Sequence, residues 1–399
     1  MNPQKTVMIG LGYIGLPTAA VMASNGINVI GVDVSEKVVE TINQGRIHIV
    51  EPSLDELVHK VVQDGYLKAT SKPVAADVFL IAVPTPFKGE YIPDLSYVES
   101  AIKSLIPFLE KGNLVIIEST SPVGTTKKMQ HIINQERPDL EGEFYMAYCP
   151  ERVLPGNVIY ELEHNDRAIG GINETSTKKA QAFYSLFVKG ELHATNAQTA
   201  EMTKLVENAS RDVQIAFANE LSMIADKADI NVWELINLAN KHPRVNILQP
   251  GTGVGGHCIA VDPWFIVSEF PKEARIIRTA REINNYKTEW VIEKIKNAAL
   301  KFELENNKKP KIACMGLAFK PNIDDLRESP ALYVTQSLIN QGYKVLPVEP
   351  NIETHEHLSI YSIDEIIKQA DIIVYLVAHK EFGLTVDNSN INVLNFVGL

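Results

Sequence analysis

A glycine-rich turn near the N-terminus constrains the fold of this chain more than any other feature. Residues 6–9 form a short apolar strand pattern, and Gly10, Gly12 and Gly15 follow it with the spacing G-x-G-x-x-G. A helix of small residues and a second strand come next, and the second strand ends at Asp33. The glycine spacing alone is weak, but the complete context is typical of a βαβ unit that binds a dinucleotide.

The residues of this turn have separate physical roles. Gly10 allows the tight turn, Gly12 lets the backbone approach a pyrophosphate, and Gly15 lets the helix lie close to the strand. Asp33 is expected to bind the adenosine ribose hydroxyls and to repel a 2′-phosphate, which favours NAD over NADP. The predicted cofactor turn consists of Gly10, Gly12, Tyr13, Ile14 and Gly15.

Three threonines follow later strands of the same sheet. Thr85 and Thr120 come just after two apolar strand patterns, and Thr126 lies near the start of the next helix. In doubly wound sheets the cofactor lies beyond the carboxyl ends of the strands, so we predict cofactor contacts for all three. Each threonine alone is equally compatible with a helix cap or a turn residue.

The first part of the chain alternates strands with helices. Further strands are predicted at residues 78–83, 114–117 and 144–147. Because such alternation indicates a parallel, doubly wound sheet, we predict an NAD-binding Rossmann domain at residues 1–190.

The middle of the chain changes to long helical patterns. Residues 196–226 contain no proline or glycine and carry apolar residues at helical spacing. Residues 231–240 and 272–301 read as two further helices, because their apolar residues recur with the helical period. We therefore predict a helical middle domain at residues 191–302.

The last part of the chain returns to alternating strands and helices. A charged stretch at residues 303–309 is interpreted as a linker, and strands are predicted at 311–315, 343–348 and 372–377. These form a second α/β domain, residues 303–399. The expected fold class is α/β, with two Rossmann-like doubly wound domains joined by a helical middle domain that contains a long helix.

The composition restricts the possible partners and compartment. Hydrophobic residues make up 45% of the 399 residues and charged residues 22%, which is typical of a globular protein. The net charge of −11 argues against a nucleic-acid binder, which needs a basic surface. From the sequence we expect no membrane span and no signal peptide. Three widely separated cysteines, Cys149, Cys258 and Cys314, indicate reduced thiols and a cytoplasmic protein.

The stretch 251–263 is the most informative for chemistry. Four glycines occur within six residues, and Cys258 and Asp262 follow them. Glycines cost conformational entropy on folding, so this cluster indicates a backbone that approaches a ligand or presents an exposed side chain. Cys258 is therefore a candidate nucleophile, and it needs positive neighbours or a helix N-terminus to ionise. The alternative is a small buried hydrophobic residue, which is our interpretation of Cys149 and Cys314.

Three polar residues share one face of the long predicted helix. Lys204, Asn208 and Arg211 stand at i, i+4 and i+7, a spacing that places them side by side. Such a face suits a phosphate, an oxyanion or a proton relay. A solvated polar face is an equally good interpretation from the pattern alone.

Together these features resemble the UDP-glucose/GDP-mannose dehydrogenase family, and the resemblance runs nearly end to end. It rests on the glycine fingerprint, the pair Lys204 and Asn208, the loop GxGxGGxC with Asp262, and the second α/β domain. Three stretches are most similar to members that act on UDP-N-acetyl-D-mannosamine: CPERVLPG at 149–156, HPRVNILQP at 242–250 and GHCIAVDPWFI at 256–266.

The resemblance implies catalytic roles for five residues. Cys258 would be the covalent nucleophile. Lys204 would act in proton transfer and, with Asn208, hold the developing oxyanion. Asp262 and Glu151 would position or activate the hydrolytic water.

The resemblance also implies ligand contacts, with no metal site. Arg327 would contact NAD, and Arg244 would reach the neighbouring subunit's site in a homodimer formed through the long helix. The implied contacts with the UDP-sugar substrate are Arg152, Val153, Lys204, Asn208, Arg211, His242, Arg244, Gly255, Phe319 and Lys320.

The implied reaction is a four-electron oxidation of the C6 hydroxyl to a carboxylate, through a thiohemiacetal and a thioester on Cys258, for surface polysaccharide synthesis such as capsule or enterobacterial common antigen. UDP-N-acetylglucosamine and UDP-glucose remain alternative substrates. A two-electron hydroxyacid-type dehydrogenase and a non-catalytic nucleotide-sugar or NAD-binding regulator are the rivals from other classes.

Some positions depart from the patterns of related chains. UDP-glucose dehydrogenases typically carry a second glutamate near Pro155, and UDP-N-acetylglucosamine dehydrogenases usually have proline at Ala260. Related chains also place an aspartate and a basic residue near the end, where this chain has Asn395. One contact with the UDP-sugar is therefore expected to be missing or supplied by another residue.

Overall fold

The chain divides into two compact units, Met1–Val206 and Glu207–Leu399. The computed structural model describes residues 5–89, 91–153, 156–256, 258–384 and 391–399. Pro155 lies outside these residues. None of the described helices is both long enough and apolar enough to cross a membrane.

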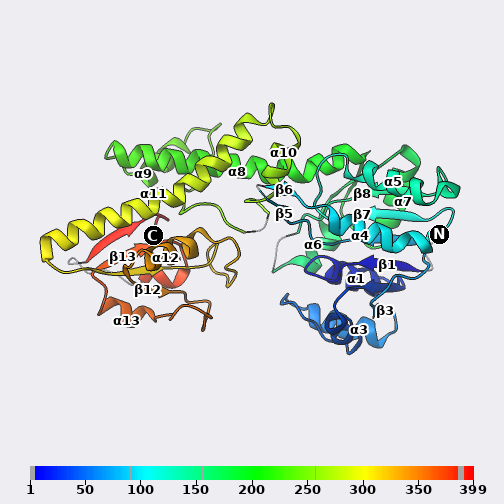
Figure 1. Cartoon of the computed structure of the whole chain (residues 1–399), viewed down its shortest axis with the longest axis horizontal. Helices are drawn as coiled ribbons and strands as arrows, with labels where there is room; N and C mark the ends of the chain where they lie inside the picture. Colours follow the sequence, from blue (N-terminus) through cyan, green and yellow to red (C-terminus); the bar gives the residue numbers. More distant parts are fainter. Residues whose placement is uncertain (1–4, 90, 154–155, 257, 385–390) are drawn as a thin grey trace. The chain divides into compact units, whose positions relative to one another are not determined.

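The first unit is built on one eight-stranded sheet with the order β10-β9-β8-β7-β4-β1-β2-β3 (Figure 1). Neighbouring strands are parallel, except that β9 runs antiparallel to β8. The strands are β1 (Thr6–Ile9), β2 (Val29–Val32), β3 (Leu67–Thr70), β4 (Val78–Ile81), β7 (Leu114–Ile117), β8 (Tyr145–Tyr148), β9 (Arg167–Gly171) and β10 (Leu192–Asn196). A short hairpin, β5 (Phe87–Lys88) and β6 (Ile92–Pro93), stands apart from this sheet.

Both faces of this sheet are covered by helices, because its strands are apolar on both sides. In β1, Met8 lies in one hydrophobic cluster, whereas Val7 and Ile9 lie in the other, as the alternation of side chains along a strand requires. The helices are α1 (Gly15–Ser24), α2 (Glu36–Asn43), α3 (Leu54–Gln63), α4 (Ser96–Leu105), α5 (Thr125–Glu136), α6 (Val158–His164) and α7 (Glu174–Tyr184), with 3₁₀ turns η1 (Ile106–Phe108) and η2 (Pro138–Leu140).

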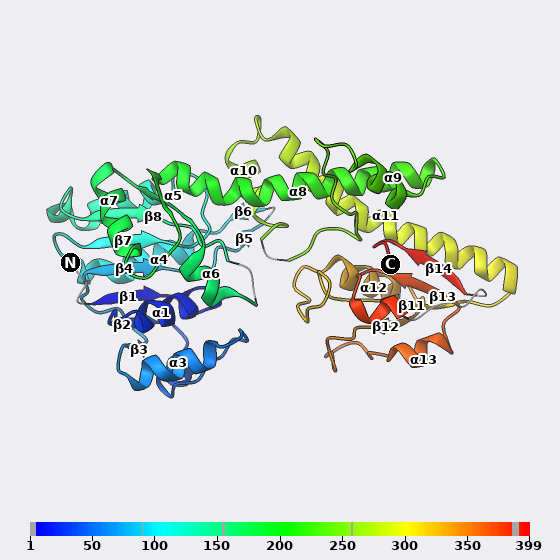
Figure 2. The same ribbon diagram turned by 180° about the vertical axis from the view of Figure 1, so that it is seen from behind.

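The second unit contains a parallel four-stranded sheet with the order β12-β11-β13-β14 (Figure 2). Side chains of its strand β11 also alternate between two hydrophobic clusters, with Ile312 in one and Ala313 in the other. Val291 and Ile295 of the long helix α11 (Arg275–Asn306) belong to the Ile312 cluster, so this helix covers one face of the sheet. The strands are β11 (Lys311–Met315), β12 (Lys344–Val348), β13 (Ile372–Tyr375) and β14 (Asn392–Asn395).

The long helix α8 runs from the first unit into the second. It spans Ala197–Lys227, against the predicted 196–226. The other helices of the second unit are α9 (Val232–Ala239), α10 (Asp262–Glu269), α11 (Arg275–Asn306), α12 (Pro330–Asn340) and α13 (Ile363–Ile367), with the 3₁₀ turn η3 (Lys380–Leu384).

The predicted fold class is confirmed, with a mostly parallel first sheet, a parallel second sheet and a helical segment between them in the sequence. The linker predicted at 303–309 is wrong in its first half, because α11 continues to Asn306. Glutamate and leucine dominate that half, and both favour helix. The sequence reading also missed α10, which begins at Asp262 with Pro263 in its first turn, a position that tolerates proline well. The first sheet continues past residue 190, since β10 pairs with β9.

Candidate active site

The glycine turn of the first unit has the geometry that a pyrophosphate requires. Gly10 has φ +90°, and a Cβ there would lie 2.4 Å from the backbone oxygen of Ala82. A Cβ on Gly15 would lie 1.8 Å from the Gly10 oxygen. By contrast, no atom of the described residues lies within 4 Å of the position of a Cβ on Gly12, so the backbone there is open to a ligand.

At the start of α1, the N-cap residue does not cap the backbone amides with its side chain. Ile14 is its N-cap residue and makes no side-chain cap hydrogen bond, and Tyr13 beside it is 51% exposed. Uncapped amides at a helix N-terminus attract a phosphate. The residues therefore fit a dinucleotide.

Asp33 lies just after β2, and backbone amides hold its side chain in place. Its Oδ2 accepts a hydrogen bond from the Leu11 amide at 3.1 Å, and its Oδ1 accepts one from the Ser35 amide at 2.9 Å. Each carboxylate oxygen has a second lone pair, so the side chain still has room to accept bonds from ribose hydroxyls.

The three predicted threonines have different environments. Thr85 and Thr120 are partly exposed after β4 and β7, whereas Thr126 is fully buried in the first turn of α5. The amides at the start of α5 are capped by Glu201 of α8, which accepts from the Gly124 and Thr126 amides and from the Thr126 hydroxyl at 2.6–2.7 Å. Glu201 thus performs the capping that the sequence suggested for Thr126.

Glu151 lies at the carboxyl end of β8 and is 6% exposed. Its Oε1 accepts a hydrogen bond from the Arg152 amide, and its Oε2 forms a 2.7 Å ion pair with Arg167. Val153 packs against the hydrophobic core beside it. The sequence reading found Glu151 through its motif but had no signal for Arg167.

In the second unit, Cys258 lies immediately before α10. Its carbonyl oxygen accepts from the amides of Val261 and Asp262, so the cysteine forms the turn that leads into this helix. Cys258 is partly exposed. Cys149 and Cys314 are fully buried, and burial raises the pKa of each to about 12. Among the three thiols, Cys258 is therefore the accessible candidate nucleophile.

An amide and a carboxylate meet next to this turn. Asn208 of α8 donates a hydrogen bond from Nδ2 to Oδ2 of Asp262 at 2.6 Å. Asp262 is 3% exposed and is the first residue of α10. The structure thus brings together three of the predicted catalytic residues of the second unit, Cys258, Asn208 and Asp262.

The glycines before Cys258 are needed because the loop lies directly on the turn after β11. A Cβ on Gly255 would lie 2.4 Å from the backbone oxygen of Glu328, and one on Gly256 would lie 3.0 Å from the Phe319 ring. The Gly256 amide also donates to the carbonyl of Arg327. The predicted nucleophile loop and the predicted substrate residue Phe319 are therefore neighbours.

Two threonines that the sequence pattern does not indicate anchor this loop. The Thr252 hydroxyl donates to the Leu376 carbonyl at 2.6 Å, and the Thr288 hydroxyl of α11 donates to the Thr252 carbonyl at 3.1 Å. A lone threonine in a loop gives no sequence signal for such a contact.

The remaining predicted residues lie on accessible surfaces of their own elements. Lys204 of α8 is partly exposed and Arg211 is exposed. Exposed residues after α9 include His242 and Arg244, and the Arg244 amide donates to the His242 ring. Lys320 is exposed in the turn after β11. Arg327, in the same turn, pairs with Asp325 at 2.6 Å.

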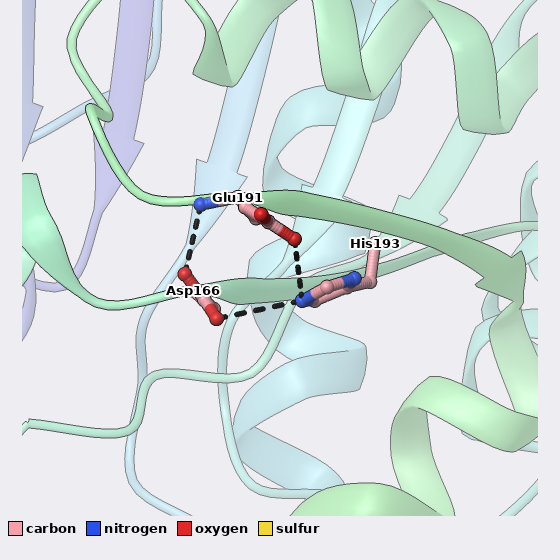
Figure 3. A group of neighbouring side chains, drawn as sticks. All are labelled: Asp166, Glu191 and His193. Carbon is pink, nitrogen blue, oxygen red and sulfur yellow. Dashed lines mark hydrogen bonds and ion pairs between the residues drawn. The ribbon is translucent and has the colours of Figure 1, made fainter.

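An exposed group of possible metal ligands lies at the start of β9 and β10 (Figure 3). Asp166, Glu191 and His193 offer ligand atoms within 4.8 Å of one another. They already bind one another, since the Glu191 amide donates to Asp166 and the His193 ring lies 3.5 Å from the Asp166 carboxylate. These contacts hold the two strand ends together.

Family models match three consecutive parts of the chain. The NAD binding domain of the UDP-glucose/GDP-mannose dehydrogenase family matches residues 4–188, its central domain 198–286, and its UDP binding domain 313–393. The chain belongs to the UDP-glucose/GDP-mannose dehydrogenase family. It is therefore an NAD-dependent oxidoreductase with a domain that binds UDP.

Individual members of this family are similar over almost the whole chain. A UDP-N-acetyl-D-mannosamine dehydrogenase of Campylobacter jejuni is 56% identical, covering 95% of this chain and 96% of that protein. An NDP-N-acetyl-D-galactosaminuronic acid dehydrogenase of Ralstonia nicotianae is 55% identical over 94% and 90% of the two chains. The structure of a UDP-N-acetylmannosamine dehydrogenase from Pyrococcus horikoshii aligns with a TM-score of 0.86 and 40% identity, covering 98% and 95% of the two chains.

Proposed function

We propose that this protein oxidises the C6 hydroxyl of UDP-N-acetyl-D-mannosamine to a carboxylate, with Cys258 as the covalent nucleophile. The observation that carries the proposal is the partly exposed Cys258 on a glycine loop, beside the hydrogen-bonded pair Asn208 and Asp262. A simple alcohol dehydrogenase needs no such thiol. NAD, when bound at the glycine turn, accepts the hydride in each of the two oxidations.

In the first oxidation, Lys204 takes the proton of the hydroxyl, directly or through a water. Cys258 then adds through Sγ to the resulting aldehyde, and the thiohemiacetal stays attached to the chain. Lys204 and the Asn208 amide stabilise the oxyanion at this carbon. This capture retains an aldehyde that would otherwise diffuse away.

The second oxidation leaves a thioester on Cys258, and water completes the reaction. Asp262 and Glu151 hold the water so that its oxygen bonds to C6 while the bond from C6 to Sγ breaks. The balance is one alcohol, two NAD and one water giving one carboxylate, two NADH and three protons.

Residues of the second unit supply most of the proposed substrate contacts. Cationic side chains neutralise phosphate without requiring a basic protein. The proposed contacts are Arg152, Val153, Lys204, Asn208, Arg211, His242, Arg244, Gly255, Phe319 and Lys320, with Arg327 on the cofactor. The proposed cofactor contacts of the first unit are Gly10, Gly12, Tyr13, Ile14, Gly15, Asp33, Thr85, Thr120 and Thr126.

We further propose that the protein is a cytoplasmic homodimer whose two subunits contact each other through α8. Its product would be a uronic acid sugar for a surface polysaccharide such as capsule or enterobacterial common antigen. The proposed division is an NAD-binding domain at 1–190, to which β10 also belongs, a middle domain for catalysis and dimerisation up to residue 302, and a UDP-sugar domain at 303–399. No nucleic-acid or membrane partner enters this proposal.

The choice of sugar rests on the motifs and on similarity. The Ralstonia relative, named for a galactosaminuronic acid, is nearly as similar as the Campylobacter one, so the corresponding N-acetylgalactosamine nucleotide is the second candidate. UDP-N-acetylglucosamine and UDP-glucose complete the set, because pockets discriminate such small changes weakly unless a polar group is left unpaired.

The test is the amount of NADH released by a limiting amount of each UDP-sugar in a reaction run to completion. Two NADH per UDP-N-acetyl-D-mannosamine, with a kcat/KM above those of the other three sugars, supports the proposal. One NADH per sugar contradicts the thioester route. Higher kcat/KM for another sugar contradicts the assignment of the substrate and leaves the mechanism intact.

A further inference from the structure

The antiparallel strand β9 brings a buried cation to the edge of the sheet where Glu151 lies. Tyr148 pairs with Gly170, and continuing this register three residues further places Glu151 opposite Arg167. Because β9 runs against β8, its first residue lies at the edge where the parallel strands end. If β9 ran parallel to β8, its first residue would lie at the opposite edge of the sheet.

Arg167 is fixed in this position by its backbone. Its amide donates to the Glu191 carbonyl at 2.8 Å, and it pairs with Leu192 of β10. The preceding residue, Asp166, belongs to the exposed cluster with His193 (Figure 3). The edge strand β10 therefore holds the arginine rigidly.

The Arg167 guanidinium is buried and donates hydrogen bonds to Glu151 and to one backbone carbonyl. It is 2% exposed, donates from Nη1 to Glu151 at 2.7 Å and from Nη2 to the Leu162 carbonyl at 3.0 Å. Its Nε has no hydrogen-bond partner in the described part of the chain. A buried arginine is costly to desolvate, so an arrangement centred on one carboxylate suggests a role beyond stability.

A second buried carboxyl group lies in the same cluster. Tyr184 donates its hydroxyl to Oε1 of Glu118 at 2.6 Å, and the Tyr184 ring lies 5.5 Å from the Arg167 guanidinium carbon. Burial raises the pKa of Glu118 to about 7, against the lowering effect of Arg167. When Glu118 is protonated it carries no negative charge, so the positive charge of Arg167 is balanced by the Glu151 carboxylate.

We propose that Arg167 is the positioning residue that orients Glu151 for hydrolysis of the Cys258 thioester. This inference rests on the proposed function. Arg167 holds Oε2 of Glu151 while the Arg152 amide holds Oε1, so these two hydrogen bonds set the orientation of the carboxylate. Each oxygen keeps a lone pair for a water. In the step it serves, water adds to the thioester carbon, the thiol leaves, and the carboxylic acid formed loses its proton.

The test separates hydride transfer from hydrolysis. Arg167→Met, Arg167→Lys, Glu151→Gln and the double variant Arg167→Met with Glu151→Gln are mixed with saturating NAD and UDP-N-acetyl-D-mannosamine in a stopped-flow instrument. NADH is followed by absorbance, and the mass of the intact protein in acid-quenched samples is measured by mass spectrometry. Arg137→Met is the matched control, because Arg137 also pairs with a carboxylate of the first unit, Asp139.

The expected result for Arg167→Met is an NADH burst at the wild-type rate, followed by turnover slowed roughly 10- to 100-fold. The UDP-uronyl adduct on Cys258 should accumulate. Arg167→Lys should recover part of the loss, the double variant should be no slower than Glu151→Gln, and Arg137→Met should behave as wild type.

A burst slowed as much as turnover, without an adduct, overturns the inference, and so do additive losses in the double variant. If Arg167→Met does not fold by circular dichroism, Arg167→Lys is judged by the same criteria, because it keeps the charge. A wild-type enzyme that releases one NADH per sugar contradicts the proposed function itself, whereas two NADH with unaltered Arg167 variants contradicts only this inference.

Discussion

The buried carboxyl of Glu118 makes a quantitative prediction about how stability depends on pH. Burial raises the pKa of this group from 4.5 to about 7 in the folded chain. The folded state therefore holds a proton that the unfolded state releases above its own pKa. Below pH 4.5 both states are protonated and Glu118 costs nothing. Stability is lost as pH rises from 4.5 to 7 and levels off above 7, and the total loss is about 3 kcal/mol at 1.36 kcal/mol per pKa unit.

The substitution Glu118→Gln keeps the shape and the bond from Tyr184 but cannot ionise. We expect its stability relative to wild type to increase by about 2–3 kcal/mol between pH 5 and pH 8. Any loss from the altered hydrogen bonding is about 1 kcal/mol and does not vary with pH, so it shifts the whole curve without changing its slope.

The assay is urea unfolding of both proteins in matched buffers at pH 5, 6, 7 and 8, followed by circular dichroism. Infrared spectroscopy adds a direct reading, since a protonated carboxyl band that fades near pH 7 in wild type should be missing from Glu118→Gln. Parallel stability curves within about 1 kcal/mol, the uncertainty of such a comparison, would refute the reasoning, because Glu118 would then be ionised at the same pH in both states.

Three further predictions address the cofactor turn, the nucleophile and the second unit. Gly15→Ala places a Cβ 1.8 Å from the Gly10 oxygen, so NADH affinity measured by fluorescence should fall at least roughly 10-fold, as for other disrupted backbone sites. Cys258→Ala should lower NADH turnover by roughly four orders of magnitude, whereas Cys314→Ala, at a buried thiol, should lower the thermal midpoint and leave kcat unchanged. Burial lowers the pKa of Lys287 to about 7. Burying the charged ammonium therefore lowers the free energy of unfolding most below pH 7, and this loss disappears towards pH 10.5. In urea unfolding, the stability advantage of Lys287→Met should shrink by about 3 kcal/mol between pH 7 and pH 10.

The parts of the fold that depend on local patterns were predictable from the sequence. The strand at 6–9 and the helix at 197–227 follow from apolar period and from the absence of glycine and proline. The helix α10 was missed because its glycine-rich approach resembles a loop. The antiparallel β9 was also missed, since direction in a sheet depends on pairing between distant strands and has no signature in a single strand.

The same division holds within the site. Gly10, Cys258 and Asp262 carry a signal because their residue types are unusual in their setting. Arg167 and Glu201 carry none, because each is an ordinary charged residue until the fold buries it against a specific partner. Residues that hold catalytic groups in place are therefore harder to predict than the groups themselves.

The polar contacts between α8 and α11 extend this point to the support of the nucleophile loop. Asp212 of α8 accepts from Arg281 and Asn284 of α11 at 2.7 Å, and Asn284 in turn accepts from Asn219. The Asn219 side chain then accepts from the Gly251 amide, the first residue of the loop. A buried polar group that loses its partner has no hydrogen bond to offset the cost of its desolvation. This chain of contacts therefore fixes the spacing of the two helices and the start of the loop together. Its effect on Cys258 is therefore indirect, and a change at Asp212 should disturb the loop before it disturbs the sheet.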